Sequence, residues 1–424
     1  MAVAVSPVAE TCRAAKRAAR VLARTDTAVK DGALEAIAQA LESRIAEILE
    51  ANELDMAAGR EAQIGEALLD RLRLDAGRVL AIARAVRQIA ALPDPVGEVI
   101  DGHRLANGLD VRKVRVPLGV VAVVYEARPN VTIDAAALCL KSGNAIVLRG
   151  SSSAEHSNRS LAQIAAEAAV GAGLPEGSVS LVAGGGREEL AELATQRESV
   201  DLIIPRGGES LKEALQAVAT VPVIYAASGN CHVYVDRSAD LQMAERIVLN
   251  AKTQRPGVCN AAETLLVHEQ LAEEFVPLIV AALTGAGVRV RADAGSLGLA
   301  SAAGGALVEP ASAADWDTEY LAPVIALGLV DSAEQAIEHI AAHGSGHSEA
   351  IVTRDTAAAR AFQLGVDAAC VYVNASTRFT DGGEFGMGAE IGNSTQKLHA
   401  RGPIGLRELC TFKYLVEGDG HVRP

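Results

Sequence analysis

The segment NAKTQRPGVCNAAETLLVH, residues 250–268, contains a cysteine in surroundings that suit covalent chemistry. Cys259 follows a Pro-Gly pair and precedes a β-rich run, with Lys252 and Arg255 close in sequence. Positive charge near a polar turn favours the thiolate, which is the nucleophilic form of cysteine. The segment therefore predicts a nucleophile at Cys259, while a buried loop cysteine is the alternative that this segment alone leaves open.

The other cysteines are far apart, at positions 12, 139, 231, 370 and 410. No two of the six have the spacing of a disulfide framework or a zinc site. We therefore expect reduced thiols, as in a cytoplasmic protein, and five of them should fill small spaces in the core.

Three glycines in AGGGREEL, residues 183–190, precede a helical pattern and superficially resemble a phosphate-cradling turn. The spacing is not GxGxxG and no Walker lysine follows, so a tight turn is the favoured interpretation. A nicotinamide cofactor, if one binds, would use a mode different from the usual Rossmann one.

Histidines at 339, 343 and 347 are four residues apart, and histidines at i and i+4 on one helix face can ligate a metal. Gly344 and Gly346 should end the helix before the third histidine, and no nearby Cys or Asp completes a ligand set. We therefore expect no metal, and a helix C-terminus whose dipole stabilises the histidines is the simpler interpretation.

The elements that must position these residues follow a clear order. Residues 1–92 have the periodicity of helices, which Pro-Asp-Pro at 93–95 stops. Residues 99–115 predict a β-hairpin, with turn signals at Asp101-Gly102 and Asn107-Gly108. A strand, helix, strand alternation then begins and predicts a mostly parallel, doubly wound sheet.

Two such alternating regions fit a chain of 424 residues, which exceeds what one hydrophobic core usually serves. The first region has strands at GVVAVVYEA, NAIVLRG, SVSLVAG and DLIIPRG. The second, over about 222–385, has strands at VPVIYAA, CHVYVD, AAETLLVH, PVIALGLV, EAIVT and CVYVN. Near the C-terminus, ELCTFKYLVEGDG predicts a strand that pairs with the 99–115 hairpin in this subunit or a neighbouring one.

Charge and hydropathy exclude some functions. The formal charge of −14 repels phosphodiester backbones, so we expect no nucleic-acid partner. No apolar run reaches the roughly 18 residues of a membrane span, so we expect no membrane insertion.

The N-terminal segment has the pattern of an amphipathic helix. An Arg-rich and Ala-rich start also fits a mitochondrial transit peptide, but Glu10 and the uninterrupted helical sequence that follows favour a surface helix. The apolar face of this helix should consist of Val8, Cys12, Ala15, Ala19 and Leu22.

Longer blocks of the chain carry a family resemblance. The cofactor-lobe stretch of the aldehyde dehydrogenase superfamily is similar to VPLGVVAVVYEARPNVTIDAAALCLKSGNAIVLRGSSSAEHSN, and later blocks of that superfamily are similar to GLPEGSVSLVAGG, QRPGVCNA and TEYLAPVIAL. The resemblance covers nearly the whole chain. One branch, whose members reduce L-glutamyl 5-phosphate, is specifically similar to YEARPNVT, HGSGHSEAIVT and VYVNASTRFTDGGEFGMGAEIGNSTQKLHARGPIGLREL.

The resemblance implies an α/β fold of the aldehyde dehydrogenase type, with two doubly wound lobes and a small β-hairpin element for oligomerisation. An NADP(H)-binding lobe would comprise residues 1–98 and 116–225, and a catalytic lobe with the nucleophilic cysteine residues 226–390. Oligomerisation strands would lie at 99–115 and 405–424.

The resemblance also implies a reaction in proline biosynthesis. Cys259 would attack the acyl carbon of L-glutamyl 5-phosphate, phosphate would leave, and hydride from NADPH would reduce the thioester to glutamate 5-semialdehyde. Asn130, in the matching asparagine position, would donate a side-chain N–H to the developing oxyanion, together with the backbone N–H of Cys259.

One departure from the wider superfamily supports this branch. Hydrolytic aldehyde dehydrogenases carry a glutamate base in a strand whose counterpart here is AASGNCHVYVD, which offers Ser228, Gly229, Asn230 and Cys231 instead. A base for hydrolysis of the thioester is therefore missing from its expected place.

Other site residues are carried over by position. Arg149 and Ser151 would lie near the adenosine ribose, where a guanidinium favours the 2′-phosphate of NADP(H). Glu319 matches the glutamate that holds the nicotinamide ribose. A turn that can approach the pyrophosphate consists of Pro205, Arg206, Gly207, Gly208 and Ser210. The phosphate or α-carboxylate of the substrate would be held by candidates Arg255, Lys397, His399 and Arg401.

Two competing hypotheses remain open. The chain could be an NAD-dependent aldehyde oxidiser or CoA-acylating enzyme of the same fold, or a non-catalytic subunit that keeps the fold without turnover. Under the leading hypothesis a separate glutamate 5-kinase supplies the labile acyl phosphate, and an association with that kinase is an expectation. We also expect a homo-oligomer.

Overall fold

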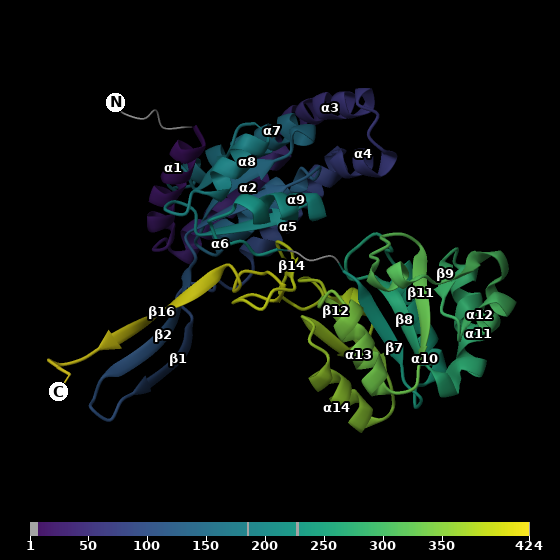
Figure 1. Cartoon of the computed structure of the whole chain (residues 1–424). Coiled ribbons are helices and arrows are strands. Elements are labelled where there is room, and N and C mark those ends of the chain that lie inside the picture. The colour runs from purple at the N-terminus through teal and green to yellow at the C-terminus, as the bar shows by residue number, and fades with distance from the viewer. Residues whose placement is uncertain (1–6, 185, 226–228, 424) are drawn as a thin grey trace. The chain divides into compact units, whose positions relative to one another are not determined.

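The computed structural model describes residues 7–184, 186–225 and 229–423. The chain forms two compact α/β units (Figure 1). Unit 1 comprises Met1–Ala226, Gly386–Gly392 and Ile404–Pro424, and unit 2 comprises Ala227–Phe385 and Asn393–Pro403. Both units contain parallel sheets, so the α/β prediction is confirmed.

Unit 1 begins with the predicted helices, which are α1 Pro7–Leu22, α2 Thr27–Ser43, α3 Ile45–Glu61, α4 Glu66–Leu72 and α5 Ala76–Ala90. All five predicted face residues of α1 are buried, because this helix packs against strands of unit 1. On its more polar side, Lys16 Nζ forms an ion pair with Asp201 at 2.7 Å. The prediction of a helix at the N-terminus is therefore confirmed.

The parallel sheet of unit 1 has the strand order β5-β4-β3-β6. Every residue of β3 and β4 is buried, so both faces of these strands are covered. The helices of unit 1 form two groups of contacts. One group consists of α2, α5, α6 and α7, and the other of α1 and α8. The strands and crossover helices are β3 Val120–Tyr125, α6 Asn130–Lys141, β4 Ala145–Gly150, α7 Glu155–Gly171, β5 Val179–Leu181, α8 Arg187–Ala194, β6 Leu202–Arg206 and α9 Glu209–Val218.

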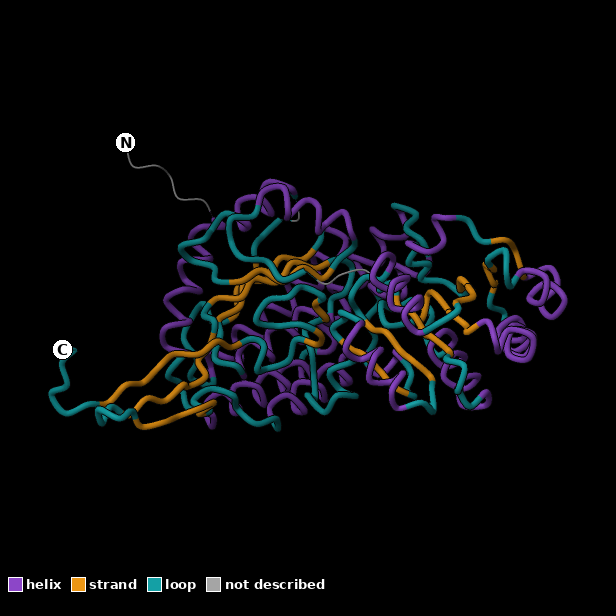
Figure 2. Tube along the Cα trace, turned by 60° about the horizontal axis from the view of Figure 1, so that its bottom comes forward, coloured by secondary structure: helices purple, strands orange, loops and turns teal. Residues whose placement is uncertain are grey.

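Unit 1 also contains a three-stranded antiparallel sheet that extends away from its helices (Figures 1 and 2). Its order is β1 Val99–Arg104, β2 Asp110–Pro117 and β16 Cys410–Glu417. The turn predicted at Asn107-Gly108 is present, since Gly108 has φ of +97° between β1 and β2. The turn predicted at Asp101-Gly102 is wrong: both residues pair within β1, beside a register shift that accommodates them.

The C-terminal strand β16 pairs with β2 of its own chain, from Cys410 opposite Pro117 to Glu417 opposite Asp110. Of the two pairings that the sequence left open, the structure therefore contains the one within a subunit.

The sheet of unit 2 has the order β10-β9-β11-β8-β7-β12-β13, and each neighbouring pair is parallel. Its strands are β7 Cys231–Val235, β8 Ala262–His268, β9 Arg289–Ala292, β10 Val308–Pro310, β11 Val324–Val330, β12 Ser348–Val352 and β13 Cys370–Val373. Its helices are α10 Leu241–Thr253, α11 Ala272–Gly285, α12 Leu297–Gly304, α13 Ala333–His343 and α14 Thr356–Gly365.

One strand expected in the second region is wrong. The described residues 221–225 of VPVIYAA form no strand of this sheet, because Val223 makes only an isolated bridge to Ile203 in unit 1. The last two residues of the segment lie outside the described residues. The short strands β9 and β10 were not predicted, since only two residues of β9 and none of β10 are buried.

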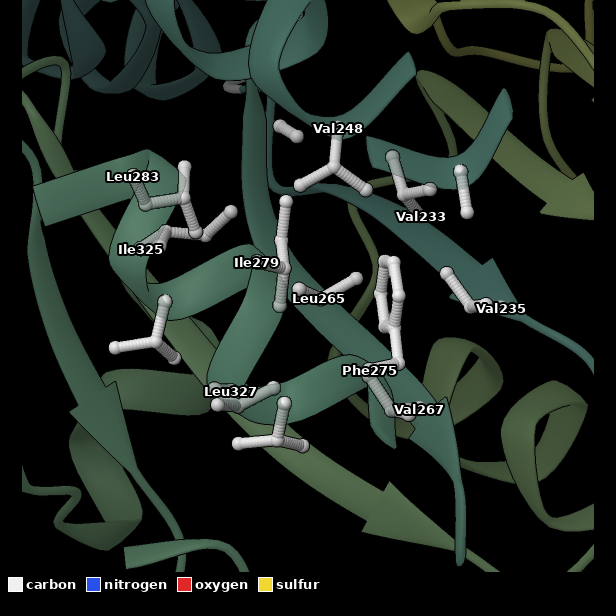
Figure 3. Packing of buried hydrophobic residues seen from close by; sticks show 14 of the residues in the cluster. Val233, Val235, Val248, Leu265, Val267, Phe275, Ile279, Leu283, Ile325 and Leu327 are labelled. Atoms are coloured by element: carbon white, nitrogen blue, oxygen red, sulfur yellow. The ribbon is translucent and has the colours of Figure 1, made fainter. Parts of the chain in front are cut away.

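Successive residues along the strands of unit 2 pack into two different hydrophobic cores. One core packs Phe275, Ile279 and Leu283 of α11 against strand residues such as Val233 and Leu265 (Figure 3). The other core contains the intervening residues Tyr234, Leu266 and Ile351, with side chains from α13 and α14. A sheet buried on both faces is the doubly wound arrangement that the alternation predicted.

The remaining elements are short. A two-stranded antiparallel pair, β14 Asn393–Ser394 with β15 Gly402–Pro403, lies in unit 2. Short 3₁₀ helices occur at Ser152–Ala154, Glu269–Leu271, Gly305–Leu307, Ala313–Asp317 and Thr377–Phe379. Among the described residues, no helix is both long and apolar enough to cross a membrane.

Candidate active site

Cys259 lies in the turn between α10 and β8, and it differs from the other cysteines in exposure. None of the six cysteines forms a disulfide, and five of them are buried, whereas Cys259 is partly exposed. Burial raises the pKa of Cys12 to about 11 and that of Cys410 to about 12, so these sulfurs stay protonated near neutral pH. The prediction that the other five cysteines fill core spaces is confirmed.

The backbone of Cys259 packs against the start of β7. A Cβ at Gly229 would lie 1.5 Å from the carbonyl oxygen of Cys259, so only glycine fits there. The Cys231 thiol donates to the same carbonyl oxygen at 3.2 Å. Burial raises the pKa of Cys231 well above its usual value, which keeps this thiol protonated as a donor. The nucleophile loop is therefore fixed by neighbouring backbone and by a neutral thiol.

The carboxylate of Glu319 lies beside the same segment. Its Oε1 accepts a hydrogen bond from the Gly229 N–H at 2.7 Å. Because Gly229 touches the Cys259 carbonyl, the structure places the predicted ribose-binding glutamate near the nucleophile loop within unit 2.

A buried ion pair joins the two elements that flank the Cys259 turn. Lys252 at the end of α10 and Glu263 in β8 are both fully buried, with Nζ and Oε2 2.5 Å apart. Burial lowers the pKa of Lys252 and raises that of Glu263, and the attraction between the two charges opposes both shifts. Glu263 Oε1 also accepts a weak hydrogen bond from the N–H of Leu321, at 3.4 Å. The pair thus links both ends of the cysteine loop to the segment that carries Glu319.

Asn260, the residue after the nucleophile, is held by the 377–380 segment. Its Nδ2 donates to the Thr380 carbonyl at 3.0 Å, and its own carbonyl accepts from Thr377 Oγ1 at 2.7 Å. Arg378 Nη1 hydrogen-bonds its Oδ1. Sequence reasoning missed Arg378, because more than a hundred residues separate it from Cys259 and no spacing signal links them.

Two of the basic residues predicted to hold the substrate are engaged elsewhere in unit 2. Lys397 and Arg401 both form ion pairs with Asp367, and Arg401 Nη1 lies 2.7 Å from Asp367 Oδ1. Arg255 is exposed in the cysteine loop itself. His399 also lies in unit 2, and its role, like that of the other three, stays a prediction.

Asn130, the predicted oxyanion donor, lies in unit 1 at the first residue of α6. Its Nδ2 donates to Asp134 Oδ2 at 2.9 Å, one helical turn later. Burial raises the pKa of Asp134 from 3.8 to about 6, opposed by the Asn130 hydrogen bond and by the charge of Arg206. The amide therefore has a fixed orientation, and a second N–H of the same Nδ2 is available for an oxyanion.

A cavity of about 260 Å³ lies beyond the carboxyl ends of β4 and β5 in unit 1. The volume suits a nucleoside, and such an edge is where open parallel sheets bind nucleotides. Ser151 lines the cavity together with Arg159, which pairs with Glu155. Arg149 is buried and its Nη2 donates to the Gly186 carbonyl at 2.7 Å. The remaining lining residues include Gly150, Asn158, Ala162, Val179, Leu181 and Gly184.

The predicted pyrophosphate turn, Pro205 to Ser210, leads from β6 into α9 as expected. Its N–H groups already attract an anion, because Gly208 donates to Glu126 Oε2 at 3.1 Å. A Cβ at Gly207 would lie 2.6 Å from the same oxygen, so the carboxylate approaches closely only because this residue is glycine. The turn can thus hold a negative group at a helix N-terminus.

The glycine-rich segment that begins at Ala183 forms a tight turn before α8, although Gly185 lies outside the described residues. Gly184 has φ of +85°, and the Glu189 carboxylate oxygens lie 2.9 and 2.6 Å from the positions that a Cβ would take at Gly184 and Gly186. The Glu189 carboxylate occupies this turn, which favours a tight turn over a phosphate-binding one.

The three histidines do not share one helix face. His339 and His343 are neighbours in α13, with ring centroids 4.7 Å apart and ring planes tilted by 46°, and His343 Nδ1 lies 2.8 Å from Asp317 Oδ1. His347 follows the helix end, is buried, and contacts Ser348 Oγ at 2.8 Å. Burial lowers the pKa of His347 to about 4. In the described part of the chain, no cluster of three or more His, Cys, Asp or Glu has the arrangement of a metal site.

Two side chains at the start of β7, where the resemblance implies that hydrolytic aldehyde dehydrogenases carry a glutamate base, are neutral here. Asn230 Nδ2 donates to the carbonyls of Trp316 and His343, at 2.6 and 2.8 Å, and Cys231 is the thiol donor described above. Ser228, the remaining side chain considered at this position, lies outside the described residues.

Comparison with known proteins agrees with this geometry. The model of the aldehyde dehydrogenase family matches residues 2–301 and 305–413. The γ-glutamyl phosphate reductase of Moorella thermoacetica is 54% identical over 409 residues, which cover 96% of this chain and 97% of that protein. The protein of the same name from Kineococcus radiotolerans is 55% identical over 412 residues, with coverages of 97% and 95%.

Solved structures extend the likeness to the fold. The crystal structure of γ-glutamyl phosphate reductase from Thermotoga maritima is 46% identical, with a TM-score of 0.95 over 99% of this chain and 100% of that one. An acetylating aldehyde dehydrogenase from Geobacillus thermoglucosidasius, 21% identical, has a TM-score of 0.68 over 98% and 97% of the two chains and shares the fold. The chain belongs to the aldehyde dehydrogenase family, in which it is similar to the γ-glutamyl phosphate reductases.

Proposed function

We propose that the protein catalyses the NADPH-dependent reduction of L-glutamyl 5-phosphate to L-glutamate 5-semialdehyde, with release of phosphate, in proline biosynthesis. One observation carries the proposal: Cys259 is the partly exposed thiol of six, in a loop fixed by hydrogen bonds, with Asn230 and Cys231 in place of a carboxylate at the start of β7 beside it. The likeness to proteins named γ-glutamyl phosphate reductase supports the choice of substrate.

The chemistry begins with a thiolate at Cys259. Its sulfur forms a bond to the acyl carbon, the carbon–oxygen bond to phosphate breaks, and the electron pair leaves on the phosphate oxygen. Hydride then adds to the carbonyl carbon of the thioester, and collapse of the resulting alkoxide releases the aldehyde and regenerates the thiolate. The backbone N–H of Cys259 and the Asn130 side chain would stabilise the negative oxygen in both steps.

The side chains at the start of β7 favour reduction of the thioester over its hydrolysis. A water molecule needs a general base to attack a thioester efficiently. Asn230 and the protonated Cys231 cannot accept a proton from water as a carboxylate would. The thioester would therefore persist long enough for reduction.

Unit 1 fits a nicotinamide dinucleotide, which supplies the hydride. The cavity beside β4 and β5 would take the adenosine portion, with Ser151, which lines it, near the ribose. Arg149 is not among the lining residues but directly precedes Gly150, which is, and it would approach the same ribose. The 205–210 turn would hold the pyrophosphate in place of the Glu126 carboxylate. Glu319 in unit 2 would bind the second ribose. The guanidinium of Arg149 is our reason for proposing NADP(H) over NAD(H).

The decisive experiment runs the reaction backwards, by mixing the protein with glutamate 5-semialdehyde, NADP and either phosphate, CoA or neither. We expect NADP reduction only with phosphate, weaker reduction with NAD, and no turnover in Cys259→Ser despite retained NADPH binding. Reduction without phosphate would contradict the proposal, because it would reveal hydrolysis. An equal rate in Cys259→Ser would end the claim that Cys259 is catalytic.

Three further features belong to this proposal. We propose a homo-oligomer, because the apolar side chains of β16 are exposed in one subunit. We propose a cytoplasmic location on the basis of six free cysteines. An association with glutamate 5-kinase would shorten the path of a labile acyl phosphate, and co-purification tests it.

A further inference from the structure

Arg378, which the proposed function does not use, lies against the nucleophile loop. Its Nη1 hydrogen-bonds Asn260 Oδ1, and its Nε donates to Gln254 Oε1 at 2.9 Å. These two acceptors stand at either end of the short turn that contains Cys259. The guanidinium is therefore anchored across the base of that turn, beside the residue that follows the nucleophile.

The positive charge of Arg378 lacks a carboxylate partner in the described part of unit 2. Both of its acceptors are neutral amide oxygens, and its Nη2 donates to none of the described residues. Burial lowers the pKa of Arg378, the nearby charge of Arg255 lowers it further, and Asp381 and Cys259 oppose these shifts. A guanidinium anchored beside the cysteine turn, with a second arginine of that turn acting on it, favours the binding of an anion.

Two other basic residues of unit 2, Lys397 and Arg401, are less suited to binding an anion. Lys397 and Arg401 both form ion pairs with the Asp367 carboxylate, and its negative charge weakens their attraction for another anion. Arg378 and Arg255 are thus the better-placed cations for a group that must lie next to the sulfur.

We propose that Arg378, assisted by Arg255, binds the phosphate group of the acyl phosphate and holds it as it leaves. The inference rests on the proposed function. The sulfur attacks a carbon that is one oxygen away from phosphorus, so the phosphate must sit beside Cys259 during the attack. The free edge of a guanidinium fits phosphate oxygens and stabilises the extra negative charge that the leaving oxygen gains. In the reverse reaction the same pair binds inorganic phosphate.

The test measures alkylation of Cys259 in the full chain by iodoacetamide, against increasing inorganic phosphate, with the modified peptide identified by mass spectrometry. We expect phosphate to slow alkylation in a saturable way. Arg378→Gln should raise the half-protecting phosphate concentration by about tenfold or more, since a charge-assisted bond is lost. Arg378→Lys should have a half-protecting phosphate concentration between these two values, because lysine keeps the positive charge but lacks the paired N–H donors of a guanidinium. Arg255→Gln should have a smaller effect, and Arg360→Gln, an exposed arginine of α14, should have none.

Three outcomes overturn the proposal. The first is wild-type protein that phosphate does not protect. The second is an Arg378→Gln protein, folded by circular dichroism, that is protected at the wild-type concentration. In the third, reverse-reaction kinetics of Arg378→Gln show a raised KM for the semialdehyde with an unchanged KM for phosphate, which would assign the arginine to the α-carboxylate. A different result would separate the two proposals. If phosphate protects Cys259 through Arg378 but the protein shows no phosphate-dependent turnover, the anion site is supported and the proposed reaction is contradicted.

Discussion

Asn130, our proposed oxyanion donor, illustrates how a single carboxylate can orient an amide. Its Nδ2 is bonded to Asp134, whose pKa burial raises to about 6. Above that pH the carboxylate is ionised and holds the amide with a charge-assisted bond; below it the charge and part of that bond are lost. We therefore expect kcat to fall several-fold as the pH drops through about 6, with an inflection that is absent in Asp134→Asn.

Protein stability provides an independent readout for the same group. The folded pKa lies above the ordinary value of 3.8, so the folded protein binds this proton more tightly than the unfolded chain does. Its contribution to the unfolding free energy is complete below about pH 4 and is lost as the pH rises through about 6. Urea denaturation should show that loss in the wild type and not in Asp134→Asn. The same pH dependence in both proteins would mean that Asp134 titrates normally.

The exposure of the cysteines shows how far residue types alone can predict a site. Composition indicated that most thiols would be core residues, and the loop around Cys259 indicated a nucleophile, because turn residues and nearby charge are local properties. Arg378 was missed because its proximity to Asn260 depends on the fold, which brings the 377–380 segment against the cysteine loop. Contacts between distant segments have no signature in spacing.

At the scale of elements, the sequence predicted strands well where both faces are buried. VVAVVY of β3 is apolar throughout and forms a strand as expected. VPVIYAA has a similar composition, but Val223 makes only an isolated bridge beside β6. Apolar runs report burial, whereas strand formation also requires a partner edge that the sequence does not specify. The short β9 and β10 were missed for the converse reason, because they are strands with few apolar residues.

The Lys252–Glu263 pair joins α10 to β8 and makes a prediction about those elements. Both charges are fully buried, so removing one leaves the other unpaired in the core. Lys252→Met should lower the unfolding free energy by about 3–5 kcal/mol, whereas replacing both residues with methionine should restore most of that loss. Chemical denaturation of the two single variants and the double variant measures the coupling. A double variant as unstable as Lys252→Met would show that the pair is not the source of the effect.

At the scale of the whole molecule, the exposed antiparallel sheet of unit 1 is the feature that a single subunit leaves unexplained. Phe412, Tyr414 and Val416 alternate along β16 and share one face of it. They are 46%, 59% and 55% exposed, an unusual row of apolar side chains for solvent. Pairing with β2 satisfies only one edge of β16, and no strand of the described residues pairs with its other edge.

These properties predict that β16 mediates self-association. Tyr414→Glu with Val416→Glu would place two negative charges on the apolar face of a protein whose formal charge is already −14, so burial against a second subunit would become unfavourable. We expect sedimentation velocity to show an oligomer for the wild type and a smaller species for this variant. Thr411→Glu, exposed on the opposite face of the same strand, is the matched control and should leave the sedimentation coefficient unchanged. If the double variant sediments like the wild type, the assembly uses another surface and the row on β16 needs a different partner.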